Sequence, residues 1–143
     1  MDRPAGRKTI LFVCTHNSAR SQMAEGLVNA FHKDGHVAYS AGTKPTAVNP
    51  HAVKAMAELD IDISKNKAKN LKQFRGKKFD YVITLCDSAK EECAYFPRAK
   101  EYVHAGFDNP SEFQGTENQI MAGFRRVRDE LREWLRTFIH EKN

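Results

Sequence analysis

The 143-residue sequence contains only three cysteines and no long run of apolar residues. An odd number of cysteines argues against a secreted framework of paired disulfides, whereas cysteines in a reducing compartment are inert, metal-bound or catalytic. The longest apolar stretch near the start, residues 10–14, is far too short to span a membrane. No segment typical of a secretory signal follows the first basic residues. We therefore expect a cytoplasmic protein without a membrane partner.

Acidic residues are fewer than basic ones, 18 against 23, which gives a net charge of +5. The basic residues do not form one block, because the C-terminal arginines alternate with Asp129, Glu130 and Glu133 as on a solvated helix face. We therefore expect no nucleic-acid partner, although a mild positive field would attract a small anion. The length suits one domain over residues 1–143 that buries its own core.

Short apolar runs alternate with helical patterns along the chain. Four runs predict strands, at residues 9–14, 36–40, 80–86 and 101–105. Helices are predicted over residues 19–33, after Asn49-Pro50, and from Thr116, where Gln119 completes a capping box. This alternation predicts the α/β class, with a central four-stranded parallel sheet and helices on both faces. Ligands of such folds bind beyond the carboxyl ends of the strands, where Cys14 and Cys86 are expected.

Residues 14–21 join the first predicted strand to the first helix. Backbone amides of such a junction can form a concave nest for an oxyanion beside the positive end of the helix dipole. Arg20 adds a planar charged fork, and Ser21 can donate to a Cys14 thiolate. Asn17 tolerates a left-handed backbone. The predicted oxyanion-binding residues are Thr15, His16, Asn17, Ser18, Ala19, Arg20 and Ser21.

Two blander interpretations stay open for this loop. Cys14 can be a small buried hydrophobe at a strand end, a common fate for cysteine. His16 is as compatible with an exposed loop residue without a role as with the mouth of a pocket. The strand, the five-residue gap, the Arg-Ser pair and the helix together favour a nucleophilic Cys14.

The pattern C-x5-R-S after an N-terminal strand resembles the low-molecular-weight tyrosine phosphatase family. The longer segment 14–26 is similar to its thioredoxin-coupled arsenate reductase branch, and the resemblance covers almost the whole chain. It includes residues 39–42, 49–50, 106–108, 115–116 and 124–130. The Cys-Arg loop identifies only the superfamily, whereas Cys86 and Cys93 indicate the reductase branch.

Reduction of arsenate to arsenite needs two electrons, which thiols supply by ending as a disulfide. A second thiol must therefore attack arsenylated Cys14, and Cys86 is the candidate; Cys93 would then attack Cys86 and leave a disulfide for an external dithiol. The resemblance implies this relay, with thioredoxin as reductant, although glutaredoxin or another thiol stays open. It implies no cofactor or metal, and phosphate or sulfate as competing oxyanions.

Two alternatives to the relay remain for the second and third cysteines. Structural zinc is disfavoured because the six residues between Cys86 and Cys93 exceed the usual ligand spacing. Alternatively, Cys86 is core packing and Cys93 an idle surface thiol.

The sequence departs from the family at several positions, two of which bear on the chemistry. The family's general acid is an aspartate before a proline, and Asn109 stands there. The adjacent Asp108 is an open alternative as the acid, although we expect its side chain to point elsewhere. We therefore expect weak phosphatase activity, because an alkoxide leaving group must be protonated. A phosphatase acting through a Cys14 phosphocysteine is the alternative function. A potassium site of some members includes a carboxylate at the position of Lys69, so we expect its ammonium in place of the ion.

Overall fold

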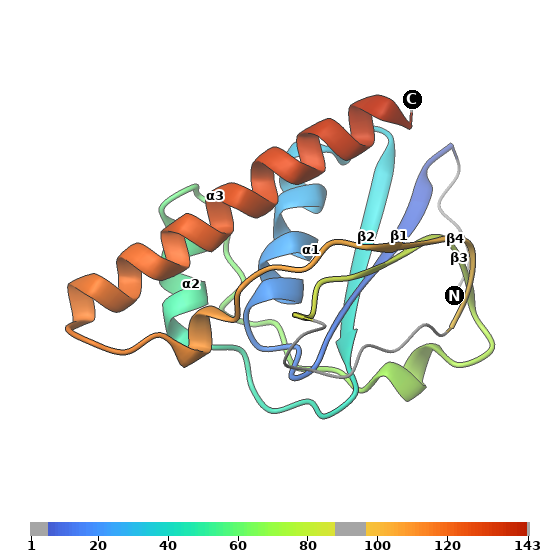
Figure 1. Ribbon diagram of the computed structural model, residues 1–143. Helices are drawn as coiled ribbons and strands as arrows, with labels where there is room; N and C mark the ends of the chain where they lie inside the picture. Colours follow the sequence, from blue (N-terminus) through green and yellow to red (C-terminus); the bar gives the residue numbers. More distant parts are fainter. Residues whose placement is uncertain (1–5, 88–96, 143) are drawn as a thin grey trace.

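The computed structural model describes residues 6–87 and 97–142 (Figure 1). Its four strands form one parallel sheet in the order β2-β1-β3-β4. The strands are β1 (Lys8–Cys14), β2 (His36–Gly42), β3 (Lys78–Thr84) and β4 (Arg98–His104). The helices are α1 (Arg20–Phe31), α2 (Pro50–Ala57) and α3 (Glu117–Glu141), with the 3-10 helices η1 (Leu71–Phe74) and η2 (Pro110–Glu112). The predicted four-stranded parallel α/β sheet is confirmed.

Strand β1 lies between β2 and β3, and its side chains alternate between two apolar layers. Ile10 and Phe12 face the larger layer, to which α1, α2 and α3 all contribute. Leu11 and Val13 face a smaller layer, which contains Leu71 and Phe74 from η1. Helical segments therefore cover both faces, but unequally, because the described cover of the second face is a single 3-10 turn.

The helix starts follow the capping signals in the sequence. Asn49 accepts a hydrogen bond from His51 N at 2.8 Å and begins α2, and Thr116 with Gln119 forms a reciprocal capping box at the start of α3. The third strand differs from the prediction, because β3 ends at Thr84 rather than residue 86. Its pairing with β4 stops there, and Cys86 lies beyond the sheet.

Strand ends place the functional loop against β2. Cys14 pairs with Gly42 at the last position of both strands. A Cβ at residue 42 would lie 2.5 Å from Thr15 O and 2.9 Å from Asn17 N, so only glycine permits this approach. The loop after β1 therefore packs directly on the β2 backbone.

None of the helices within residues 6–87 and 97–142 has both the length and the apolar character needed to cross a membrane.

His36 lies at the opposite edge of the sheet, where β2 begins. Its side chain is buried, and Nε2 has no hydrogen-bond partner among the described residues. Burial, assisted by the charge of Lys8 and by His32, lowers the pKa of His36 below the usual histidine value. The folded protein therefore binds this proton less tightly than the unfolded chain does.

We predict that His36→Leu flattens the pH dependence of stability. A depressed folded-state pKa gives stability that is present above the unfolded value of about 6.5 and is lost as the pH falls through the folded value. Urea unfolding midpoints at about pH 7.5 and about pH 5.5 measure the slope. His140→Leu, at an exposed position of α3, is the control, and equal slopes for His36→Leu and the parent would contradict the prediction.

Candidate active site

Cys14 is the last residue of β1 and lies almost fully buried before α1. Its Sγ is 2.8 Å from Ser21 Oγ in the first turn of that helix. Cys14 is also a free cysteine. The sulfur therefore lies beside both a hydroxyl and a helix N-terminus, the kind of surroundings in which reactive cysteines occur.

The carbonyls of the loop between Cys14 and Arg20 are bound by backbone amides of residues 44–49. Lys44 N donates to Thr15 O at 2.9 Å, Thr46 N to His16 O at 3.1 Å, and Asn49 N to Ser18 O at 2.8 Å. In a planar trans peptide the carbonyl and the following N–H point in opposite directions. The N–H groups of residues 16, 17 and 19 are therefore directed to the other side of the loop, as an anion-binding nest requires.

Asn17 adopts the left-handed backbone predicted from its sequence position, with a φ of 51°. Its side chain is buried and bonded at both ends. Lys69 N donates to Oδ1 at 2.8 Å, and Nδ2 donates to Ser21 Oγ at 2.7 Å. The residue at the turn of the loop thus connects the hydroxyl beside Cys14 to a segment 52 residues away.

Arg20 begins α1 and is also buried. Its NH1 donates to Leu85 O at 3.5 Å and to Phe107 O at 3.3 Å. Phe107 N in turn donates to Leu85 O at 3.2 Å. The guanidinium therefore ties the loop to the residue before Cys86 and to the segment before Asp108, and its five donors suit recognition of an oxyanion.

His16 is anchored outside this arrangement. Its Nδ1 lies 3.0 Å from Lys44 O, and because a carbonyl can only accept, Nδ1 donates. Ala19 is buried. The side chains of His16 and Ala19 are therefore held away from the loop amides or buried.

Cys86 lies at the same edge of the sheet as Cys14 and is buried. Leu85 N donates to Val13 O at 2.8 Å, which fixes the chain before Cys86 beside the end of β1. Cys86 is disulfide-bonded. Cys93 lies outside the described residues.

The two candidate acid residues make other contacts. Asn109 Oδ1 accepts from Ser111 N at 3.1 Å and caps η2. Asp108 Oδ2 pairs with Arg126 NH2 of α3 at 3.0 Å. The Asp108 carboxylate is therefore directed to α3, as the sequence led us to expect.

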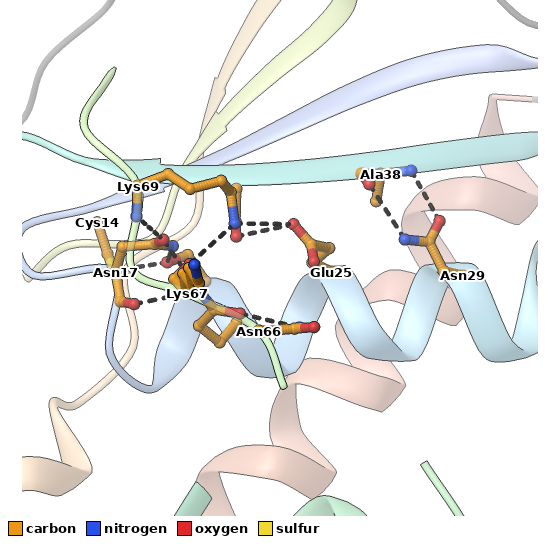
Figure 2. Close-up of polar contacts among 11 residues, drawn as sticks. Cys14, Asn17, Glu25, Asn29, Ala38, Asn66, Lys67 and Lys69 are labelled. Carbon is orange, nitrogen blue, oxygen red and sulfur yellow. Dashed lines mark hydrogen bonds and ion pairs between the residues drawn. The ribbon is translucent and has the colours of Figure 1, made fainter. Parts of the chain in front are cut away.

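The Lys69 ammonium lies among oxygen atoms beside α1, as Figure 2 shows. Its Nζ donates to Lys67 O at 3.2 Å and lies 3.8 Å from Glu25 Oε1, which also accepts from Ser40 Oγ at 2.9 Å. Burial raises the pKa of Glu25, and the Lys69 charge opposes that rise. The Lys69 ammonium thus lies among oxygen atoms, and its replacement of a potassium ion stays a prediction.

Sequence reasoning did not single out Gln22, which is fully buried beside Asn17. Its Nε2 donates to Asn17 Oδ1 at 2.9 Å and to Lys67 O at 3.0 Å. A polar residue next to the buried stripe of a helix is the signal that could have revealed it. Among residues 6–87 and 97–142, no group of three or more His, Cys, Asp or Glu side chains could hold a metal ion.

A buried cysteine, a loop with inward amides and an arginine meet at the carboxyl edge of a parallel sheet, an arrangement suited to holding an oxyanion. The chain belongs to the low molecular weight phosphotyrosine protein phosphatase family, which matches residues 9–143. It is 47% identical over 132 residues to the arsenate reductase of Halalkalibacterium halodurans, covering 92% of this chain and 95% of the relative. It is 44% identical to that of Bacillus subtilis, covering 92% and 94%.

Solved structures agree with this placement. An arsenate reductase in the phosphate-binding state superposes with a TM-score of 0.79 at 28% identity, over 94% of this chain and 98% of that one. A low molecular weight protein tyrosine phosphatase from T. tengcongensis gives 0.74 at 25% identity, over 94% and 99%. The resemblance to the arsenate reductase branch is thus confirmed.

We predict that Lys69→Met lowers the free energy of unfolding by about 1–2 kcal/mol, because it leaves the Glu25 carboxylate buried without a cation. The double variant Glu25→Gln/Lys69→Met should recover most of this loss. Chemical denaturation measures both, with Lys72→Met, at an exposed lysine of η1, as control. A Lys69→Met protein as stable as its parent would show that the pair is dispensable.

Proposed function

We propose that this chain reduces arsenate to arsenite through a relay from Cys14 to Cys86 to Cys93, with thioredoxin as reductant in the cytoplasm. The observation that carries the proposal is the placement of Cys86 at the same sheet edge as the free Cys14, beside the amide-lined loop. The names of the relatives at 47% and 44% identity support the same activity.

In the first step the loop binds arsenate. The inward N–H groups and the Arg20 guanidinium hold its oxygens while the Cys14 thiolate attacks arsenic. A sulfur–arsenic bond forms, an arsenic–oxygen bond breaks, and the leaving hydroxide takes a proton from solvent. Ser21 and the start of α1 stabilise the thiolate before the attack. Backbone amides suit this step because their direction is set before the anion arrives.

In the second step the Cys86 thiolate attacks Cys14 Sγ. A sulfur–sulfur bond forms, the sulfur–arsenic bond breaks, and its electron pair stays on arsenic, which leaves as arsenite. Cys93 then attacks Cys86 and releases Cys14, and an external dithiol reduces the remaining disulfide. Support comes from the redox state of the described cysteines, since Cys86 is disulfide-bonded while Cys14 is free.

A second candidate function is hydrolysis of phosphate esters, favoured by the family to which the chain belongs. The site argues against efficient hydrolysis, because Asn109 caps η2 and Asp108 is paired with Arg126. An asparagine amide cannot supply the proton that a leaving group needs, and the Asp108 carboxylate is already paired with a cation. Arsenite release with thioredoxin, compared with hydrolysis of an aryl phosphate, separates the two functions.

We predict that replacing Cys86 and replacing Cys93 stop the reaction at different steps. Cys86→Ser should stop turnover with Cys14 in an adduct, whereas Cys93→Ser should allow one turnover and trap a Cys14–Cys86 disulfide. Arsenite release with thioredoxin, and mass spectrometry of the trapped species, measure this, in the absence of small thiols that could replace a cysteine. Sustained turnover by either variant would remove that cysteine from the relay.

We predict that Asn109→Asp raises phosphatase turnover at least tenfold and changes arsenate reduction little, since a well-placed general acid contributes about 10²–10⁴-fold. Alkyl phosphates should gain more than aryl phosphates, because their leaving group needs the proton more. Asp108→Asn should affect neither reaction, because its carboxylate is directed to Arg126. Equal gains in both reactions for Asn109→Asp would show that this position does not protonate a leaving group.

A further inference from the structure

A chain of hydrogen bonds runs from the 66–69 segment to the Cys14 sulfur. Lys69 N donates to Asn17 Oδ1, Asn17 Nδ2 contacts Ser21 Oγ, and Ser21 Oγ lies 2.8 Å from Cys14 Sγ. Figure 2 shows the Asn17 and Lys69 part of this chain beside Cys14. The reactivity of the sulfur depends on the direction of the chain, because only a hydroxyl that donates to it stabilises a thiolate.

Backbone atoms fix that direction. Lys69 N can only donate, so the oxygen of the Asn17 amide must face it and Nδ2 must face Ser21. Ser21 Oγ then accepts from Asn17, and its own proton is left for Cys14 Sγ. A reversed Asn17 amide would take the proton of Ser21 for itself and leave the sulfur without this donor.

Gln22 is the side chain that holds Asn17 in this orientation. Its Nε2 donates to Asn17 Oδ1 at 2.9 Å and also contacts Asn17 O at 3.3 Å and Lys67 O at 3.0 Å. Two of these acceptors are backbone carbonyls, so the orientation of the Gln22 amide is itself fixed. Gln22 Oε1 accepts from Asn66 Nδ2 at 3.2 Å.

We propose that Gln22 is a positioning residue that, together with Lys69 N, maintains the polarity of this hydrogen-bond chain and so keeps Ser21 donating to the Cys14 thiolate. The inference deepens the proposed function, since it concerns the same nucleophile. It does not depend on the substrate. The Gln22 side chain is completely buried, and its amide nitrogen donates to oxygens of Asn17 and to Lys67 O.

The test is Gln22→Glu, which keeps the shape but presents oxygens to three oxygen acceptors. Alkylation of Cys14 by iodoacetamide at pH 7, followed on the peptide that contains Cys14, should be slower by about tenfold, the loss expected for a hydrogen bond to a charged group. Asn66→Ala is the matched control, because it removes only the contact to Gln22 Oε1 and should change the rate less than twofold.

The double variant Gln22→Glu/Ser21→Ala distinguishes an effect on the direction of the hydrogen-bond chain from general damage to the loop. If Gln22 acts through Ser21, Gln22→Glu should change the alkylation rate less than about twofold when Ser21 is already alanine. Equal tenfold effects with and without Ser21 would overturn the proposal, as would an unchanged rate in the single variant. If Gln22→Glu does not fold, Gln22→Met carries the same comparison, with a smaller slowing expected because Lys69 N still holds Asn17.

The alkylation measurement also separates this inference from the proposed function. If Gln22→Glu is alkylated slowly and the parent protein does not reduce arsenate, the role of Gln22 is supported and the proposed reductase function is rejected. Normal alkylation in a competent reductase would reject the role of Gln22 and leave the reductase standing.

Discussion

The left-handed turn at Asn17 is the constraint on which the rest of the site depends. The turn reverses the chain between β1 and α1. The buried Asn17 amide stabilises this strained backbone because it is hydrogen-bonded at both ends. An unpaired amide at this depth would cost roughly 1–3 kcal/mol for each lost partner. The direction of the Ser21 hydroxyl beside Cys14 follows from this one residue, and the loop amides are directed by the bonds that residues 44–49 make to the loop carbonyls. Gln22 and Lys69 are therefore as much part of the site as the loop itself.

Arg20 connects the two halves of the proposed chemistry. An arginine in an oxyanion loop needs only to hold the anion, yet this guanidinium also donates to Leu85 O and Phe107 O. It therefore lies between the loop that would accept the oxyanion and the chain that carries Cys86. Attack of one cysteine on another requires such fixed proximity, because sulfur atoms must meet within a narrow geometry.

Solved proteins with this fold include both arsenate reductases and a protein tyrosine phosphatase, so the fold by itself does not decide between reduction and hydrolysis. In this chain the loop that would supply an acid caps η2 through Asn109, and its neighbour Asp108 is drawn to Arg126 on α3. Release of arsenite requires two electrons from thiols and depends less on a proton from a general acid at position 109. The loss of the acid and the presence of Cys86 at the sheet edge thus favour the same reaction.

Short-range chemistry let the sequence determine a large part of this protein. The apolar run before Cys14, the caps at Asn49 and Thr116, and the left-handed Asn17 were all readable, because each depends on neighbouring residues. Tertiary structure alone decided that Lys69, far along the chain, holds the Asn17 amide, and that β3 stops before residue 86. The periodicity of apolar residues predicts which side of a helix or strand is buried. It does not predict which hydrogen-bond partner lies there, because partners distant in sequence do not affect the local spacing of residues.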